Sequence, residues 1–415
     1  MVYYFTCMRI VLRFITLSLL LVIPIGIWLA PGVVAFIFGG IFFLSPLWLP
    51  ILLTAILIPL WLVYVRSQYV SNIPYTVLEL KPGLETPKTA RAMELVFYSL
   101  YHRSHVSWKE SFFIGKMRMP WSFELMAHNG EVRFFMRVPT SHRATIESRI
   151  RSEYRDIDID QTNDYIRQVA FDSLSMKLAV SEYTLGKPDP YPLKTYEAYE
   201  SVKKAEDPFL NLVESLASLK NQEYFCISYI VRPHQRDREK FWKAPEDTLH
   251  GDAEGEIGNI IGSQGDVRSL PDTKKRVVEA IEEALTKPAF DVGVRAVYFA
   301  PRSQFDDVRA ESLNTLFDEF SDPNLNVLVP KNPREAISWP LSDIFSAVPP
   351  LESSYLFDLY KRRAFFAPPY YGDSFVLNTA EFATIFHIPH IVRTSPLANK
   401  NKLEPPENVP HMPIS

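Results

Sequence analysis

The sequence predicts an α+β protein that is anchored in a membrane by an N-terminal hairpin of two helices. Residues 14–65 contain no charged residue and no histidine, a composition typical of membrane-spanning helices. Two stretches of the remaining chain each follow the order strand, helix, strand, strand, helix, strand, which is the order of a ferredoxin-like (split βαβ) unit. A small α/β part near the C-terminus completes the predicted architecture.

The apolar segment is long enough for two membrane crossings. Its 52 residues would form about 78 Å of helix, more than twice the hydrocarbon core of about 30 Å. After a short N-terminal segment, residues 1–13, we predict spans at about 14–36 and 44–65, with the turn near Gly39-Gly40. The other chain breakers that could hold this turn are Pro31-Gly32 and Ser45-Pro46.

The charges that flank the spans predict their orientation. Arg9 and Arg13 precede the first span, Arg66 follows the second, and the turn between them has no Lys or Arg. By the positive-inside rule, both ends face the cytoplasm. We therefore predict a multi-pass protein of the inner (cytoplasmic) membrane with its soluble part in the cytoplasm. A cleaved signal peptide that ends near Ala30 is the competing interpretation, although no A-x-A cleavage site precedes Pro31.

The first ferredoxin-like unit is predicted over residues 75–165. Its clearest element is a hairpin at Asn129-Gly130, because both central positions of a type I′ turn need positive φ. Apolar residues from Met93 to Leu100 recur at the spacing of a buried helical face, after a cap at Thr86. The predicted strands and helices of this unit are residues 75–80, 86–100, 123–128, 131–138, 140–154 and 156–160.

The second ferredoxin-like unit is predicted over residues 174–331, with an insertion at residues 234–288. The glycine-rich stretch Gly251–Gly265 is interpreted as a flexible loop within that insertion. Asp207 before Pro208 is typical of the start of a helix. The predicted strands and helices of this unit are residues 176–183, 207–219, 224–231, 277–285, 292–300, 305–320 and 326–329.

A local likeness supports a duplication of the two units. Val132–Ser141 aligns without gaps on Val294–Ser303, so that strand, proline and helix start coincide. A repeat of this length indicates a duplicated domain rather than a solenoid. A chance likeness is the alternative, because strand-proline-helix junctions are common.

The C-terminal α/β part is predicted over residues 332–393. It comprises a helix near residues 352–364, a strand at residues 375–377 and a short helix capped by Asn378 or Thr379. Residues 394–415 are polar and rich in proline, which is typical of a tail.

The composition excludes several classes of function. A net charge of -4 gives no overall attraction to nucleic acid. No Gly-Lys-Ser or Gly-Lys-Thr is present, so the chain lacks a P-loop. Cys7 and Cys226 are the only cysteines, and the pairs His102-x-x-His105 and His387-x-x-His390 lack a third ligand nearby in sequence. We therefore predict no catalytic residue, no cofactor and no metal.

Basic residues gather in the first unit and mark a possible surface for a partner or for nucleic acid. The predicted residues of this surface are Arg133, Arg137, Arg143 and Arg149. Acidic residues such as Glu131 and Glu147 lie among them. This mixture favours ordinary solvent-exposed faces over direct contact with nucleic acid.

Several motifs in the soluble part carry a family resemblance. They are Glu85–Ala90, Ser122–Leu125, Gly130–Phe134, Arg362–Phe366, Leu377–Pro389 and the tail Pro405–Pro410. With these motifs, the chain resembles the membrane-anchored N-terminal region of a family of uncharacterised domains from candidate-phyla bacteria. Similar regions there often precede, or are fused to, HerA/FtsK-like motor ATPase domains of type IV secretion systems. The resemblance implies a motor ATPase as partner.

These observations together predict a membrane-tethered, non-catalytic adaptor or scaffold that positions a DNA- or protein-translocating ATPase. The lipid bilayer is its other predicted partner, and the sequence leaves the oligomeric state open. The alternative is a membrane-bound enzyme or ligand sensor that uses a pocket between the two repeated units. A buried polar cluster that joins Arg363, Glu381 and His387 would favour that alternative.

Overall fold

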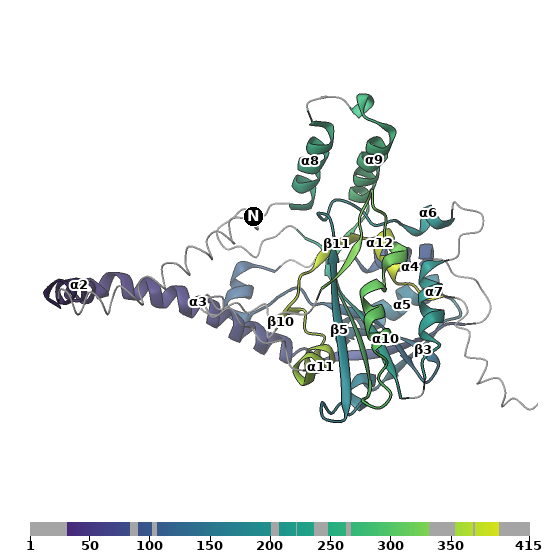
Figure 1. The fold of residues 1–415 in the computed structure, drawn as a ribbon, viewed down its shortest axis with the longest axis horizontal. Coiled ribbons are helices and arrows are strands. Elements are labelled where there is room, and N and C mark those ends of the chain that lie inside the picture. Colours follow the sequence, from purple (N-terminus) through teal and green to yellow (C-terminus); the bar gives the residue numbers. More distant parts are fainter. Residues whose placement is uncertain are drawn as a thin grey trace, which may run out of the picture.

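A computed structural model of the chain describes residues 31–83, 90–101, 106–200, 207–220, 222–235, 248–262, 267–331, 353–367 and 370–389. These residues form a nine-stranded antiparallel sheet with helices packed on it, and long apolar helices project from this body (Figure 1). The predicted α+β class is therefore confirmed.

The projecting helices are α2 (Pro31–Phe43) and α3 (Ser45–Ser71). Within the described ranges, α3 is the one helix that is long and apolar enough to cross a membrane. It contains nearly all of the predicted span 44–65 and continues six residues beyond it. Of the other predicted span, 14–36, residues 14–30 lie outside the described residues.

The turn predicted at Gly39-Gly40 is wrong, because α2 runs through both glycines. The break lies at Leu44, directly before Ser45-Pro46. Proline has no N–H to donate and is tolerated in the first turn of a helix. Membrane-type helices also tolerate glycine in their interior, as α2 does here. The break therefore coincides with the start of α3, where Pro46 stands in the first turn.

The strands of the main sheet fall into two halves with the same order. The eight strands of the two halves are β1 (Tyr75–Lys81), β2 (Trp121–His128), β3 (Glu131–Pro139), β4 (Asp158–Thr162), β5 (Met176–Leu185), β6 (Tyr224–Pro233), β7 (Ala289–Pro301) and β8 (Leu328–Lys331), and the ninth strand, β11 (Phe375–Asn378), pairs with β7. Their order in the sheet is β4-β1-β3-β2-β6-β7-β5-β8. The first half contains β1–β4 and the second half β5–β8. Counted from the centre of the sheet outwards, each half places its second strand first, then its third, its first and its fourth. The halves join where β2 pairs antiparallel with β6, with Trp121 opposite Val231.

Several local predictions agree with the structure. The Asn129-Gly130 turn is confirmed, with φ of 53° and 78° at the two residues. Asp207 caps its helix by accepting a hydrogen bond from the backbone N–H of Phe209. Thr140, by contrast, starts a short 3-10 turn and bonds the Thr76 hydroxyl instead of capping a helix. The predicted Thr86 cap lies outside the described residues.

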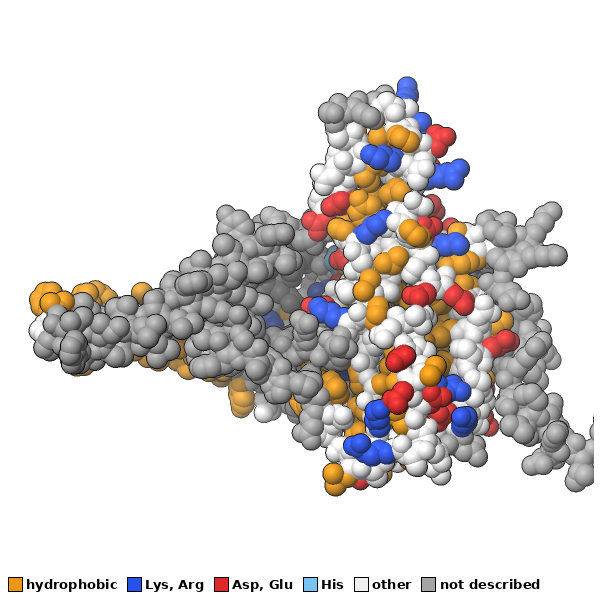
Figure 2. All heavy atoms as spheres, viewed as in Figure 1, with side chains coloured by type: hydrophobic (Ala, Val, Ile, Leu, Met, Phe, Trp, Pro, Cys, Tyr) orange, Lys and Arg blue, Asp and Glu red, His pale blue; other side chains and the backbone are white. Residues whose placement is uncertain are grey.

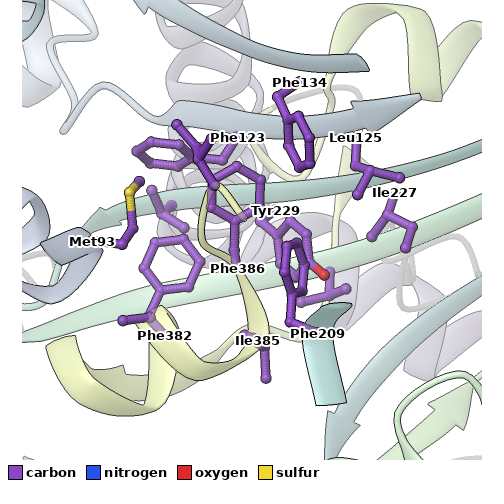
Figure 3. Close-up of a cluster of buried hydrophobic side chains, with 14 of the residues drawn as sticks. Met93, Phe123, Leu125, Phe134, Phe209, Ile227, Tyr229, Phe382, Ile385 and Phe386 are labelled. Carbon is purple, nitrogen blue, oxygen red and sulfur yellow. The ribbon is translucent and has the colours of Figure 1, made fainter. Parts of the chain in front are cut away.

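One face of the sheet is covered by helices from both halves. These helices are α4 (Ala90–Leu100), α5 (Arg143–Glu153), α7 (Pro208–Leu216), α10 (Asp307–Ser312) and α12 (Thr379–Ile385). α12 lies at the centre of this face, where its Phe382 ring points into the aromatic cluster (Figure 3). Phe382 stacks on Phe97 with ring centroids 4.1 Å apart. Phe386 contacts Phe123 from the first half and Phe209 from the second. α12 therefore binds the two halves together through aromatic packing.

The opposite face is covered by the C-terminal segment before α12. Its elements are α11 (Ser353–Arg362), β9 (Phe366–Ala367) and β10 (Tyr370–Tyr371). The chain then adds β11 (Phe375–Asn378) to β7 in the main sheet and enters α12. The described residues of the predicted C-terminal part thus pack on both faces of the sheet. Residues 332–352 and the predicted tail lie outside the described residues.

The insertion between β6 and β7 contains two helices, α8 (Thr248–Ile261) and α9 (Asp272–Thr286), which stand side by side away from the sheet (Figure 1). The prediction of a loop from Gly251 is therefore wrong as far as Ile261. Ala253 is fully buried, whereas a side chain added at Gly255 or Gly258 would meet open space. Packing of one apolar face thus outweighs the poor helix propensity of glycine. The helix predicted at residues 277–285 is confirmed within α9.

The remaining described helix is α6 (Tyr196–Glu200), and the 3-10 and π turns are Glu110–Ile114, Thr140–His142, Tyr165–Gln168, Val267–Ser269, Leu313–Thr315 and Asp318–Phe320.

Candidate functional site

The face of the sheet under the C-terminal segment buries charged side chains. Along β2, Phe123 and Leu125 point into the aromatic core, so Glu124 between them points to the opposite face. Glu182 on β5 and Arg295 on β7 lie on this opposite face as well and pair there. Because a buried charge is costly unless it is paired, this face has a different chemistry from a structural core.

Arg363 is the centre of the largest charged cluster. Its guanidinium binds Glu124 in a bidentate manner, at 2.9 Å from Nε to Oε1 and 2.8 Å from Nη2 to Oε2. It also donates from Nη1 and Nη2 to the Asp164 carboxylate, at 2.6 and 2.9 Å. The Arg363 and Glu124 side chains are only 2% and 0% exposed. One arginine thus holds two carboxylates.

The pairing keeps both partners ionised. Burial by itself would raise the pKa of Glu124, but the charge and hydrogen bonds of Arg363 bring it below its ordinary value. Burial by itself would lower the pKa of Arg363, but Glu124 raises it well above the ordinary value. The cluster is therefore a stable ion pair rather than a proton donor at neutral pH.

Neutral hydroxyl groups complete the cluster. Tyr165 donates to Glu124 Oε2 at 2.7 Å, and its oxygen lies 2.8 Å from the Tyr360 hydroxyl. The Ser122 hydroxyl donates to the other oxygen of Glu124. Burial raises the pKa of Tyr165 and of Tyr360 well above the ordinary value, so both stay protonated. The carboxylate of Glu124 is thereby fully hydrogen-bonded.

The backbone at Arg363 is strained to place this side chain. Arg363 has a φ of 52°, in the left-handed region. The position follows the end of α11, where Ala364 N donates to Leu359 O at 3.0 Å. Helices commonly end this way with glycine, because a side chain there costs about 1–2 kcal/mol. An arginine here indicates that its guanidinium is required at this place.

A cavity of about 820 Å³ adjoins the cluster. Its walls come from the end of α3, from β1 and β3, from residues 161–168 and from residues 362–367. The Arg137 guanidinium lies over the Tyr75 ring, 3.6 Å from its centroid. The Tyr75 hydroxyl donates to Pro120 O at 3.3 Å. The stacked arginine is therefore held in place at the wall of the cavity.

Burial and the nearby Arg363 lower the pKa of Arg137 from its ordinary value, in that order of importance. No carboxylate pairs with Arg137 among the residues that the structure describes. The three other arginines of the wall are matched. Arg363 binds Glu124 and Asp164, Arg167 lies 3.4 Å from Asp164, and Arg362 lies 2.7 Å from Asp358. The cavity thus has one unmatched positive charge, that of Arg137.

The second buried pair is formed by Arg295 and Glu182. Arg295 Nε donates to Glu182 Oε1 at 2.9 Å, and the Tyr370 hydroxyl donates to Glu182 Oε2 at 2.6 Å. The Phe365 ring covers the pair and occupies the place of a side chain at Gly293, 2.2 Å from an ideal Cβ. Glycine is therefore needed at residue 293, and the ring closes this part of the face.

A short segment before β2 lies against α3. The Trp61 indole N–H donates to Phe112 O at 2.8 Å. Gly115, with φ of 74°, touches the Val65 backbone so closely that a Cβ would lie 2.3 Å from it. Phe113 and Ile114 are 63% and 59% exposed. The segment thus carries exposed apolar side chains beside the last turns of the apolar helix.

The four arginines predicted as one surface lie on two sides of the sheet. Arg133 and Arg137 lie on β3 at the charged face, where Arg133 pairs with Glu79 at 2.7 Å. Arg143 and Arg149 lie on α5, which packs on the aromatic face. Arg143 binds Glu147, and Arg149 is exposed. Only Arg137 reaches the cavity.

The three residues suggested for a pocket between the units do not meet. Arg363 lies at the charged face, whereas Glu381 and His387 lie at or next to α12 on the aromatic face. His387 Nε2 lies 2.6 Å from Asp207. Glu381 accepts from the Leu193 backbone N–H at 2.6 Å. The described part of the seam on this face is filled by aromatic rings and gives the pocket hypothesis no support (Figure 3).

Sequence reasoning missed Glu124, Asp164 and Tyr165. Glu124 carried a usable signal, because it is a lone charge within an apolar strand. The Asp164-Tyr165 pair carried none, since its role depends on a contact with Arg363, which lies 199 residues from Asp164 in the chain.

A comparison with protein families matches residues 76–396 to a domain of unknown function (DUF8128). The matched region begins at β1, directly after α3, and includes both halves of the sheet and α12. No curated protein matches the chain.

Proposed function

The chain belongs to the DUF8128 family, and we propose that this member is a membrane-tethered, non-catalytic adaptor. It would position a separate DNA- or protein-translocating ATPase of a type IV secretion-like system at the inner membrane. The observation that carries the proposal is the short junction between α3 and the sheet. Only residues 72–74 separate the end of α3 from β1, so a membrane that α3 spans would hold the body at its surface.

Contacts beyond this short link support a fixed body. The segment before β2 bonds α3 through Trp61 and Phe112. The end of α3 lies against β9 of the C-terminal segment. The body thus contacts α3 at three places, which would hold it in a fixed orientation to the helix. An adaptor that positions a partner at a membrane needs such a fixed orientation. We keep the proposal of a membrane hairpin with spans at about 14–36 and 44–65, whose two ends face the cytoplasm; α3 covers nearly all of the second span.

We further propose that each half of the sheet is a ferredoxin-like unit and that the two arose by duplication. The matching strand orders of the halves support this, as does the alignment of Val132–Ser141 on Val294–Ser303. The aligned stretches fall on β3 and β7, which are the third strand of each half. Both strands end at a proline, Pro139 or Pro301.

The charge distribution favours a protein partner over nucleic acid. On the side shown in Figure 2, acidic and basic side chains are intermixed over the body, and no broad basic area is visible. The predicted arginines also divide between two sides of the sheet. The proposal that the partner is a motor ATPase rests on the family resemblance of the motifs in the soluble part. The aromatic seam at α12 leaves little room for a catalytic pocket there.

Co-purification tests the proposal. The full chain, with a C-terminal tag, is expressed in its own host and purified from membranes in mild detergent. We expect a motor ATPase to co-purify in a fixed ratio, and a tagged unrelated membrane protein serves as control. A single homogeneous species without any ATPase, also after cross-linking in intact cells, would contradict the adaptor function.

A further inference from the structure

The cavity beside Arg137 lies at the depth where a membrane would end. Its α3 wall includes Ser67 and Ser71, which follow the last apolar residue of the span, Val65, by about 3 and 9 Å along the helix. Headgroups occupy about 5–7 Å on each side of the hydrocarbon core. This wall of the cavity therefore passes through the predicted headgroup layer.

The segment before β2 marks the same level independently. Phe113 and Ile114 expose apolar side chains beside α3, and Lys109 and Lys116 lie on either side of them in the chain. Aromatic and basic residues together are typical of the membrane interface. Since Trp61 binds this segment, the boundary of the bilayer lies near Trp61 to Val65, and the cavity begins one turn beyond.

The cavity wall provides the chemistry to bind an anion. Arg137 is unmatched by a carboxylate in the described residues, and the Tyr75 ring holds its guanidinium in a defined plane. A planar, oriented guanidinium suits two oxygens of a phosphate group. Hydroxyl and amide side chains of the same wall that could bond further phosphate or glycerol oxygens are Ser67, Thr162, Asn163 and Gln168.

We propose that this cavity binds the phosphate headgroup of an anionic phospholipid from the adjoining leaflet, with Arg137 as its main charged contact. The headgroup enters beside Ser67, and its acyl chains remain in the bilayer along α3. Free phosphate shares the recognition chemistry, but the position of the cavity at the headgroup layer favours a lipid. The inference rests on the proposed membrane placement of α3 and not on any partner ATPase.

Lipid retention in defined bilayers tests the inference. The full chain and its variants are placed in nanodiscs of phosphatidylcholine mixed with phosphatidylglycerol, then released into detergent, and the bound lipid is identified by native mass spectrometry. Arg137→Gln is compared with Arg149→Gln, which removes the same charge from the exposed surface of α5. We expect the first variant to bind phosphatidylglycerol about tenfold more weakly, because one charge-assisted hydrogen-bonding group is lost.

Arg137→Lys keeps the charge but loses the planar fork, so its affinity should lie between those of wild type and Arg137→Gln. Equal melting temperatures in pure phosphatidylcholine establish that the variants are folded. Equal retention of phosphatidylglycerol by all variants would overturn the inference. A second arm adds inorganic phosphate to nanodiscs of pure phosphatidylcholine. Stabilisation by phosphate that depends on Arg137, without retention of lipid, would also overturn the lipid assignment.

Carbonate extraction of membranes separates this inference from the proposed function. A chain that is released by carbonate would not be integral, and the membrane placement itself would be wrong. A chain that resists extraction but binds both lipids equally would leave the adaptor intact and exclude the headgroup site.

Discussion

The two faces of the sheet are built from the same strands but held by different forces. Under α12, rings such as Phe97, Phe123 and Phe382 pack without polar partners. Under α11, side chains such as Glu124 and Arg363 pack as ion pairs. Alternation along each strand produces this difference, because neighbouring residues point to opposite faces.

The contrast indicates that the aromatic face stabilises the fold, whereas the charged face forms a site. Burial of aromatic surface stabilises the fold through the hydrophobic effect, which is non-directional. A buried ion pair adds little net stability, since replacing both partners by apolar residues is often neutral or favourable. The charged face, the strained Arg363 and the adjoining cavity therefore indicate a role other than holding the fold together.

The largest expected effect is on the aromatic face. Phe382→Ala should lower the free energy of unfolding by about 4 kcal/mol, because the cavity at the centre of α12 removes contacts with both halves. Chemical denaturation of the full chain in detergent measures this. Leu95→Ala on the exposed side of α4, where Leu95 is 49% exposed, is the control and should change little. A small effect of Phe382→Ala would mean that α12 does not join the halves.

On the charged face, a single substitution at Arg363 should lower the free energy of unfolding, and a second substitution at Glu124 should restore most of it. Arg363→Met leaves the buried Glu124 without its cation, whereas Asp164 keeps Arg167, and should cost about 3 kcal/mol. The double variant Arg363→Met with Glu124→Leu should regain most of this loss, since it removes the buried carboxylate. The same denaturation experiment compares the three proteins. If the double variant were as unstable as the single one, the ion pair would be a true source of stability and the contrast between the faces would fail.

A smaller, pH-dependent effect is expected from Glu381, a buried acid of the aromatic face. Burial raises its pKa from 4.5 to about 7, although the Asn378 and Leu193 backbone N–H groups bond it. The folded state therefore holds its proton more tightly than the unfolded state. Protonated Glu381 therefore contributes to the free energy of unfolding in full below pH 4.5. This contribution falls between pH 4.5 and 7 and stays reduced at higher pH.

Glu381→Gln removes this titration and keeps the capping box, in which glutamine serves as well as glutamate. Near pH 4.5 the variant should be somewhat less stable than wild type, because its amide nitrogen cannot accept the hydrogen bond from the Leu193 backbone N–H. Between pH 4.5 and 8 the difference should shift in favour of the variant by at most about 3 kcal/mol. Melting curves of both proteins across this range measure the difference. A difference that does not grow with pH would show that Glu381 is not buried as an acid.

Local patterns were sufficient for most of the sheet. The Asn129-Gly130 turn, the start of α7 at Asp207 and the apolar spacing in α4 depend on residues a few positions apart. α8 shows where this reasoning fails, because its glycines predict a loop until α9 offers a face to pack against. Arg363 could be placed near a helix end, but its partner Glu124 lies 239 residues away.

The amino-acid order alone determined that an apolar stretch precedes an α+β body and where most strands begin, because composition and side-chain periodicity act over one element. Tertiary structure decided that α12 joins the halves, that Arg363 gathers two carboxylates and that Arg137 opens on a cavity beside α3. These features arise from contacts between distant residues, whose energies depend on burial and geometry rather than on neighbours in the chain.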